Sequence, residues 1–255
     1  MDSVCVQEEQ LMHRFYADPD CVSGDQAVLS PEDARHALTV LRMKTGQPVE
    51  IIANGRRWNA VIGCTDNQSV SVRFISQLPS TEAKLSVTLF QGLPKADKMD
   101  LIIQKATELG VSAVVPVLMN RCVSRPDAKD IKRKLERWRK IAREAGKQCG
   151  RCVIPEILEP AAVDRLPGSV GLPAANVVPW ENASGYGPLA FRRDHPELSS
   201  LGILIGPEGG IEKEEIDLLR SFGFTTITLG KRILRTETAG LAAVSSFMSL
   251  YGEME

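Results

Sequence analysis

Long hydrophobic runs are missing from this 255-residue chain. No apolar stretch approaches the roughly 18–20 residues that a membrane-spanning helix requires, so we expect no membrane partner. The first eleven residues hold three acids and no base, which is the wrong charge for a secretory or organellar signal. We predict that residues 1–12 form a short leader and that the protein is cytoplasmic.

Histidine is scarce, and metal-ligand spacing is lacking. The three histidines, His13, His36 and His195, are isolated in the sequence. Cys149 and Cys152 have CxxC spacing, but a zinc site needs two further ligands in suitable company, so we expect no metal. The six cysteines are an even number, yet a chain long enough to bury a core does not need disulfides. Reduced thiols agree with a cytoplasmic protein.

Two catalytic signatures are also absent. The sequence contains no GxxxxGKS/T loop and no GxSxG elbow, so the P-loop and α/β-hydrolase classes lack their residues. The segment 185–190, GYGPLA, matches the GxGxxA phosphate fingerprint. That fingerprint requires a regular helix directly after it, and Pro188 followed by residues 192–196, RRDHP, predicts a poor one. We therefore assign no ligand to this segment.

Net charge is close to balanced at −1, but its distribution is uneven. Residues 121–151 hold twelve Lys or Arg against four Asp or Glu, a local balance of +8. A basic block in an otherwise acidic chain indicates a localised contact with a polyanion. The alternative is a solvated helix face that binds nothing, which is the commoner fate of charged faces.

Residues 13–77 have the pattern of a small β domain. Ser30-Pro31-Glu32-Asp33 predicts a helix start, with Ser as the cap and acids in the first turn, and the helix is expected to reach about Met43. Alternating stretches separated by hairpin-type turns predict strands. These strands are expected at 48–53, 57–63 and 69–75. Short strands that close on themselves indicate a small barrel, and residues 78–82 are the expected linker.

From residue 84 to residue 255, strands and helices alternate, which is the signature of an α/β domain with a mainly parallel sheet. Asp97 is predicted to cap the first helix of this region and Gly110 to end it. The expected strands lie at 85–90, 111–117, 152–158, 174–180, 201–205 and 225–229. The other expected helices lie at 127–147, 212–222 and 237–251.

Two glycine-containing loops follow the last two predicted strands. Residues 205–211, IGPEGGI, precede a helix, where glycines let a ligand approach closely and free N–H groups are available. Residues 229–239, LGKRILRTETA, open the last helix. Loops after consecutive strands lie side by side at the carboxyl edge of an α/β sheet, where ligands bind. The residues alone indicate either an enzyme with an adenosine-containing cofactor, a non-catalytic RNA-binding module, or tight turns without a ligand.

The pair GPEGGIEKEEI and LGKRILRTETA resembles the signature of the RsmE family, the ribosomal RNA N3-methyluridine methyltransferases of the SPOUT superfamily. Three further segments are similar to motifs of this family and follow in the family's order. They are His13-Arg14-Phe15-Tyr16, residues 93–111 (LPKADKMDLIIQKATELGV), and residues 145–151 with Gln148 and Arg151. Departures from the pattern, such as Tyr16 in place of Phe and Cys149 in place of Ser, are mild.

The resemblance implies a PUA-like RNA-binding barrel over 13–77 and a SPOUT methyltransferase domain over 84–255 whose end is threaded into a trefoil knot. Such knots are rare exceptions to the usual connection rules. It also implies S-adenosyl-L-methionine as the cofactor, held by the two loops, and a homodimer whose interface forms the catalytic pocket. The implied cofactor-binding residues are Ile205, Gly206, Pro207, Glu208, Gly209, Gly210, Leu229, Gly230, Ile233, Leu234, Arg235 and Thr238.

The implied reaction is methylation of N3 of a uridine in 16S ribosomal RNA of the small subunit, with naked RNA or the assembled subunit as substrate. Arg235 is expected to stabilise negative charge that develops on the uracil carbonyls. Glu237 is expected either to accept the N3 proton or to orient Arg235; alternatively, the two residues form a structural pair at a helix start. Other functional alternatives are methylation of another RNA or of the ribose, and RNA binding without catalysis.

RNA contacts are expected in both predicted domains. In an RNA-modifying protein the basic block favours phosphate contact, with an affinity that falls steeply with salt. His13 and Tyr16 are expected to stack on or bond to unpaired bases; alternatively, Phe15 and Tyr16 belong to the barrel core. The predicted RNA-binding residues are His13, Arg14, Arg121, Arg125, Arg143 and Arg151.

Overall fold

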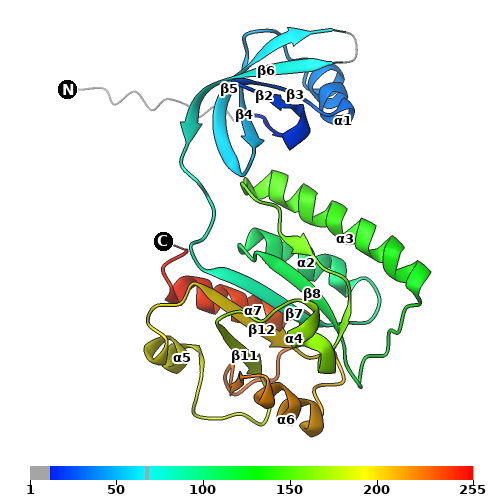
Figure 1. The fold of residues 1–255 in the computed structure, drawn as a ribbon, viewed down its shortest axis with the longest axis vertical. Coiled ribbons are helices and arrows are strands. Elements are labelled where there is room, and N and C mark those ends of the chain that lie inside the picture. The colour runs from blue at the N-terminus through cyan, green and yellow to red at the C-terminus, as the bar shows by residue number, and fades with distance from the viewer. Residues whose placement is uncertain (1–11, 67–68, 255) are drawn as a thin grey trace, which may run out of the picture. The chain divides into compact units, whose positions relative to one another are not determined.

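The structure is a computed structural model that describes residues 12–66 and 69–254 (Figure 1). The chain divides into two compact units between Thr81 and Glu82. Of the predicted leader, only Met12 is among the described residues. Within the described ranges, no helix has the length and apolar character needed to cross a membrane.

Unit 1, up to Thr81, is built on one six-stranded sheet in the order β1-β4-β5-β6-β3-β2. Its strands are β1 (Arg14–Ala17), β2 (Val22–Ser23), β3 (Gln26–Val28), β4 (Pro48–Ala53), β5 (Arg56–Thr65) and β6 (Val70–Leu78). Neighbours are antiparallel except β1 and β4, which pair in parallel. Asn54 and Gly55 join β4 to β5 with positive φ of 51° and 70°, the backbone of a tight hairpin turn.

The helix of unit 1 starts where the sequence predicts but ends earlier. Ser30 Oγ accepts a hydrogen bond from the backbone N–H of Asp33 at 3.1 Å, which is the usual N-cap arrangement. α1 (Pro31–Arg35) continues directly into a π-helical turn, η2 (His36–Val40). Arg42 then has a positive φ of 52°, which a right-handed helix does not accommodate. The predicted end at Met43 is therefore wrong, and Met43 packs into the core of unit 1 instead.

Unit 2, from Glu82 onward, holds a seven-stranded sheet in the order β10-β8-β7-β12-β11-β13, with β9 also pairing with β8. Its strands are β7 (Ser86–Gly92), β8 (Ala113–Leu118), β9 (Glu156–Ile157), β10 (Ala161–Ala162), β11 (Ala175–Pro179), β12 (Ser200–Ile205) and β13 (Phe224–Ile227). Neighbouring strands pair in parallel. The predicted α/β fold with a mainly parallel sheet is confirmed.

In the described part of unit 2, six α-helices accompany this sheet (Figure 1). They are α2 (Lys98–Glu108), α3 (Ala128–Cys149), α4 (Leu166–Ser169), α5 (Pro188–Asp194), α6 (Lys213–Ser221) and α7 (Thr236–Leu250). Short 3-10 turns lie at Pro19–Cys21 and Val163–Arg165. α7 packs against α2, β7 and β12, so the carboxyl-terminal helix begins beside the strands at the centre of the sheet.

Two helix predictions need correction. Asp97 stands at the N-cap of α2, but its side chain accepts no cap hydrogen bond. α5 does form, beginning at Pro188 within the GxGxxA segment, although the sequence predicts a poor helix there. Pro188 is its first residue, a position where the missing N–H is not needed and the fixed φ of proline suits a helix.

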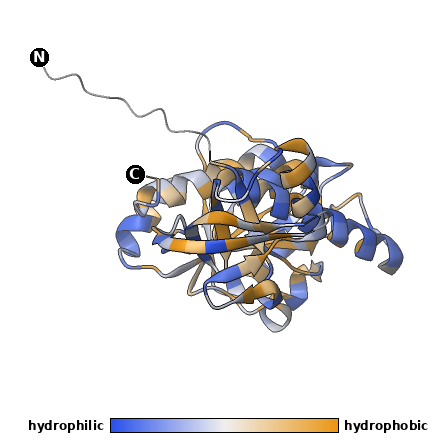
Figure 2. Cartoon of the chain, turned by 90° about the horizontal axis from the view of Figure 1, so that it is seen from above, coloured by the Kyte–Doolittle hydropathy of each residue, from blue (hydrophilic) through white to orange (hydrophobic). Residues whose placement is uncertain are grey.

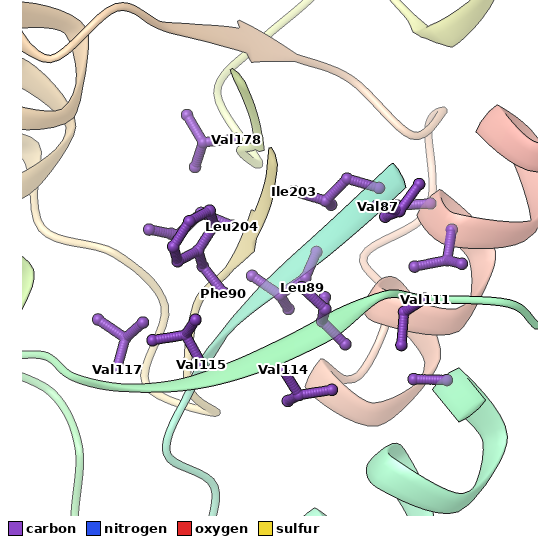
Figure 3. Close-up of a cluster of buried hydrophobic side chains, with 14 of the residues drawn as sticks. Val87, Leu89, Phe90, Val111, Val114, Val115, Val117, Val178, Ile203 and Leu204 are labelled. Carbon is purple, nitrogen blue, oxygen red and sulfur yellow. The ribbon is translucent and has the colours of Figure 1, made fainter. Parts of the chain in front are cut away.

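The core of unit 2 supports the strands that end at the site described below (Figure 3). Leu89 and Phe90, consecutive residues of β7, are both fully buried, because strands of a parallel sheet are covered on both faces. Other buried side chains labelled in the close-up include Val87, Val114, Val115, Val117, Ile203 and Leu204. The same core includes three residues of α7, Val244, Phe247 and Met248. Packing within one chain is therefore enough to bury these side chains.

Candidate functional site

A cleft of about 590 Å³ lies where β11, β12 and β13 end. The loop after β12 and the loop after β13 line it, together with Pro179, Trp180 and Glu181 at the end of β11. β11 lies between β12 and β13 in the sheet, so all three strands deliver their following residues to the same edge. The sequence predicts that the two loops meet, and the structure brings them together.

The predicted cofactor-binding residues can be placed one by one. Eleven of the twelve line this cleft: Ile205, Gly206, Pro207, Glu208, Gly209, Gly210, Leu229, Gly230, Ile233, Leu234 and Arg235. Thr238 does not line it and is exposed on the first turn of α7. Thr236 and Ala239 of the same turn line the cleft instead, because residues of one helical turn point in different directions.

Glycine is needed at two positions of these loops for different reasons. At Gly209 a Cβ atom would lie 2.8 Å from Cβ of Arg121, closer than side-chain atoms pack. Gly230 has a φ of +105°, and a Cβ added there would meet nothing within 4 Å, so its requirement is conformational rather than steric. Gly209 is therefore required by a close neighbour and Gly230 by its own backbone conformation.

Thr236 ties the two loops to the centre of the sheet. Its Oγ1 donates a hydrogen bond to the backbone carbonyl of Gly206 at 2.7 Å and accepts one from Nε2 of Gln91 at 2.9 Å. Gln91, at the end of β7, is fully buried and also donates to the carbonyl of Gly92. Buried polar groups that bond in this way specify one arrangement of the backbone. Sequence patterns single out neither Thr236 nor Gln91, because the two residues lie far apart along the chain and meet only in the folded protein.

Lys98, the first residue of α2, joins the two loops at the edge of the cleft. Its Nζ lies 3.0 Å from Oε1 of Glu208 and 3.1 Å from Oε2 of Glu237. Glu208 also accepts a hydrogen bond from the backbone N–H of Lys95 at 3.1 Å. Glu208 follows β12 and Glu237 begins α7, so one ammonium group holds carboxylates from two separate segments. The sequence predicts a helix start at Lys98 but no role for its side chain.

These ion pairs set the charge of all three groups. Hydrogen bonds with Glu208 and Glu237 raise the pKa of Lys98 above its ordinary value. The pKa of Glu237 is lowered, first by its own backbone N–H and then by Lys98 and Arg235, which outweigh burial. Burial would raise the pKa of Glu208, but its own N–H, Lys98 and Lys95 together lower it. Glu237 is therefore ionised at neutral pH and is able to accept a proton.

Arg235 is the N-cap residue of α7 and is exposed at the cleft. Among the described residues its guanidinium has no hydrogen-bond or ion-pair partner. Glu237 is paired with Lys98 rather than with Arg235, although the positive charge of Arg235 still contributes to lowering the pKa of Glu237. The structural ion pair between Arg235 and Glu237, which the sequence left as an alternative, is therefore not formed among the described residues.

Comparison with known proteins places this site in a family. A model described as an RNA methyltransferase domain matches residues 81–248. Ribosomal RNA small subunit methyltransferase E of Bacillus subtilis is 35% identical over 224 residues, which are 86% of this chain and 88% of that protein. Its counterpart from Aquifex aeolicus is 30% identical over 93% of this chain and 100% of that protein. The chain belongs to the ribosomal RNA small subunit methyltransferase E family.

Two solved structures are similar to this chain over nearly its whole length. Ribosomal RNA small subunit methyltransferase E from Neisseria gonorrhoeae, bound to S-adenosyl methionine, is 30% identical with a TM-score of 0.82, covering 96% of this chain and 100% of that chain. A putative methyltransferase from Legionella pneumophila with bound SAM is 31% identical with a TM-score of 0.78, covering 93% and 97%. The resemblance to the RsmE family is confirmed.

In this member of the small subunit methyltransferase E family, Arg121 lies directly beside the first loop. Its guanidinium donates a hydrogen bond to the carbonyl of Gly209 at 3.0 Å and approaches Glu212 at 3.4 Å. Arg125 donates to the carbonyl of Asn120 at 3.2 Å. Both arginines are exposed, and through Arg121 positive charge lies beside the first loop of the cleft.

The basic helix α3 presents its charge outward and its apolar residues inward. Leu135, Trp138 and Ala142 are buried, whereas Arg143 is exposed and the helix is mostly hydrophilic in colour (Figure 2). Part of the positive charge is paired: Arg137 pairs with Asp100, and Arg133 pairs with Asp130 at 2.8 Å. The helix is thus an amphipathic element of the core with a cationic outer face.

Arg151 is not on that outer face. Its side chain is buried, with Nη2 2.6 Å from Oε2 of Glu82. Nη1 donates to the backbone carbonyls of Val111 at 2.5 Å and Thr107 at 3.3 Å. A guanidinium directed at internal partners in this way is not presented to an RNA phosphate. Arg151 is therefore a structural tie within unit 2 rather than the exposed RNA contact that the sequence predicts.

The predicted RNA-binding residues of unit 1 divide in the same way. His13 is exposed. Arg14 pairs with the buried Glu50 at 2.7 Å, as does Arg57 at 2.8 Å. Burial would raise the pKa of Glu50, but hydrogen bonds from Arg57 and Arg14 lower it. Tyr16 is 8% exposed and its neighbour in β1, Phe15, 2%. Phe15 packs in the hydrophobic core of unit 1, as the alternative has it, and Tyr16 is buried outside that cluster.

The part of the chain that the structure describes contains no group of three or more His, Cys, Asp or Glu residues that could hold a metal ion. Cys152 is buried, and Sγ of Cys149 lies 3.7 Å from the carbonyl of Gly146. Both thiols thus lie among protein groups within unit 2.

Proposed function

We propose that this chain transfers a methyl group from S-adenosyl-L-methionine to ribosomal RNA of the small subunit. The observation that carries this proposal is one cleft formed by two glycine-containing loops, which Thr236 joins through its hydrogen bond to Gly206. The relatives support it, because they are named ribosomal RNA small subunit methyltransferase E and two solved structures contain the methyl donor.

The cleft fits such a cofactor. Leu229, Ile233 and Leu234 supply apolar surface and the loop after β12 supplies backbone N–H groups, a combination suited to an adenosine with a charged tail. Nε1 of Trp180 is a buried donor without a partner among the described residues, at a residue that lines the same cleft. When bound, S-adenosylmethionine supplies a methyl carbon on a positively charged sulfur: the acceptor's electron pair forms the new bond to carbon, and the carbon–sulfur pair stays on sulfur.

The acceptor that we propose is N3 of a uridine. This nitrogen carries a proton that must leave before its electron pair is free to form a new bond. We assign to the ionised Glu237, at the start of α7 beside the cleft, the role of accepting that proton, and to Arg235 that of stabilising the negative charge that builds up on the uracil carbonyls. Glu237 acting only to orient Arg235 is less favoured, since its carboxylate pairs with Lys98.

For RNA binding we propose the exposed cations and the N-terminal unit. Arg121, Arg125 and Arg143 are exposed in unit 2, and His13 in unit 1. Arg14 remains a candidate, although its guanidinium is shared with Glu50. Unit 1 would act as a PUA-like RNA-binding barrel, and the substrate would be naked 16S RNA or the assembled small subunit in the cytoplasm.

The trefoil knot and the homodimer are also proposals. Insertion of β12 between β7 and β11 and the hydrogen bond from Thr236 back to Gly206 support a threaded carboxyl-terminal segment.

The proposed homodimer would use a concave surface that adjoins the cleft. This surface is lined by small residues, Gly187, Gly230 and Ala242, and by the exposed Leu189, and a second copy would cover it. Sedimentation analysis that gives the mass of a monomer at all concentrations would contradict the dimer.

Mass spectrometry of nucleosides tests the function directly. The protein is incubated with labelled S-adenosylmethionine and either small subunits or 16S RNA, and the digested RNA is analysed. We expect label in N3-methyluridine, and loss of that nucleoside from the RNA of a deletion strain. Label in a ribose, or in RNA of another class, would favour a different methyltransferase of this fold, and no label with either substrate would favour an RNA-binding module.

A further inference from the structure

Lys98 makes two contacts that the proposed reaction leaves without a role. Its ammonium group lies 3.0 Å from Glu208 and 3.1 Å from Glu237. The three side chains are between 19% and 30% exposed, so they stand at the border between solvent and protein. The bridge spans the start of α2, the loop after β12 and the start of α7, three segments that are distant in sequence and are held together here by charge.

The surroundings of Glu237 show why a cation is needed at this point. The charged groups that face it are Lys98 from α2, Glu208 from the loop after β12, and Arg235 from its own helix start. Two carboxylates that share one cation repel each other once the cation is removed, and one of them then takes up a proton more readily. Arg235 is exposed at the cleft and is not hydrogen-bonded to Glu237, so it cannot replace Lys98 as a fixed partner.

We propose that Lys98 is a positioning residue for methyl transfer, which fixes the carboxylate of Glu237 as the acceptor of the substrate proton. This inference rests on the proposed function. Lys98 itself lines the cleft, and the role proposed here is exerted through Glu237. In the step concerned, the N3–H bond of uracil breaks and its proton passes to Glu237. The electron pair left on N3 would form the bond to the methyl carbon of the bound donor, whose carbon–sulfur bond would break with its electron pair kept by sulfur. The ammonium keeps the carboxylate ionised beforehand and restrains its rotamer.

The first test is the pH dependence of single-turnover methyl transfer at saturating cofactor and RNA. In Lys98→Met we expect the acid limb of the rate profile to move to higher pH, because the carboxylate loses its cation. Each unit of that shift lowers the rate about tenfold on the acid side. Lys98→Arg restores the charge and should return the limb towards its original position. The matched control is Lys105→Met, which removes another Lys–Glu pair of α2, with Glu108 at 2.8 Å, away from the cleft.

A double-mutant cycle separates action through Glu237 from a general effect on the fold. If Lys98 acts through Glu237, then Lys98→Met combined with Glu237→Gln should methylate at the rate of Glu237→Gln alone, because the interaction is already absent. Rates that multiply independently would overturn the proposal. So would an acid limb that is the same in Lys98→Met and the wild-type protein.

A readout without RNA or catalysis completes the test. Carboxylate carbon resonances of glutamate-labelled protein are titrated in the wild type and in Lys98→Met, and the signal missing from Glu237→Gln identifies Glu237. We expect it to titrate at higher pH in Lys98→Met, and an unchanged titration would refute the inference. Failure of the proposed function looks different: the wild-type protein would then label no small-subunit RNA, while the titration would still report on the bridge.

Discussion

The hydroxyl of Thr236 donates a hydrogen bond to the backbone carbonyl of Gly206 across 2.7 Å, although 30 positions separate them. Gln91 holds the same hydroxyl from β7 at 2.9 Å. One side chain thus fixes the start of α7 against the end of β12, so the two loops of the cleft keep a constant spacing. The geometry of the cleft depends on this buried contact as much as on the glycines of the loops.

Thr236→Val tests that contact. Valine preserves the shape but leaves the carbonyl of Gly206 and one donor of Gln91 without a partner, which costs about 1–3 kcal/mol for each buried group. We expect a lower free energy of unfolding in urea and weaker binding of S-adenosylhomocysteine by calorimetry. Thr238→Val, two residues on and exposed, should change stability by less than about 0.5 kcal/mol. Equal stability of the two variants would show that the buried bonds are unimportant.

Gly209→Val tests the close approach of the first loop to Arg121. The new Cβ would lie 2.8 Å from Cβ of Arg121, and overpacking of this kind costs about 1–3 kcal/mol. The loop must then move, so calorimetric binding of S-adenosylmethionine should weaken at least about fivefold. Gly168→Ala is the control, since its Cβ meets nothing within 4 Å. Unchanged cofactor affinity in Gly209→Val would remove this loop from the cofactor site.

Arg151→Met should destabilise unit 2. It leaves the carboxylate of Glu82 without its guanidinium partner and the carbonyls of Val111 and Thr107 without a donor. Loss of one partner of a buried pair costs about 3 kcal/mol, to be measured by chemical denaturation. Arg143→Met, on the exposed face of α3, serves as the comparison and should leave the stability nearly unchanged. A stable Arg151→Met protein with weakened RNA binding would restore Arg151 as an RNA contact.

Arg143→Met and Arg125→Met should each weaken RNA binding by an electrostatic effect that does not depend on sequence. Loss of one phosphate contact reduces the slope of log affinity against log salt by about 0.7–0.9. Filter binding of small-subunit RNA between low and moderate salt measures this slope. If the slope is unchanged in both variants, Arg125 and the cationic face of α3 are a solvated surface, which is the alternative that the sequence leaves open.

The lowered pKa of Glu50 predicts how the stability of unit 1 changes at acidic pH. Its pKa is lower in the folded state than the ordinary value of 4.5, because Arg57 and Arg14 bond to the carboxylate against the opposing effect of burial. A lowered folded-state pKa gives stability that is present above the unfolded pKa and is lost as pH falls through the folded pKa. Unfolding followed between neutral pH and pH about 3 should show this loss. Glu50→Gln should be less stable at neutral pH and less sensitive to acid, and an unaltered acid response would contradict the assignment.

Much of the fold follows from local pattern. The strand at 48–53 and the helix from 127 are visible as apolar periodicity and cap residues, which depend on neighbours three or four positions away. The end of α1 and the presence of α5 escape such reasoning. A positive φ at Arg42 and a helix opened by Pro188 depend on how the surrounding chain packs, and neither leaves a signal of its own in a single sequence.

The sequence by itself determined the two loops, the glycines within them and, through family resemblance, the methyl donor. Only the tertiary structure decided which charged groups meet. Arg151 resembles its neighbours on a basic segment, yet it turns inward to Glu82, and Lys98 resembles any helix-start lysine, yet it bridges Glu208 and Glu237. The physical reason is that oppositely charged side chains pair when the fold brings them close together. For the Lys98 bridge, that proximity depends on the position of β12 between β7 and β11, which no local sequence pattern predicts.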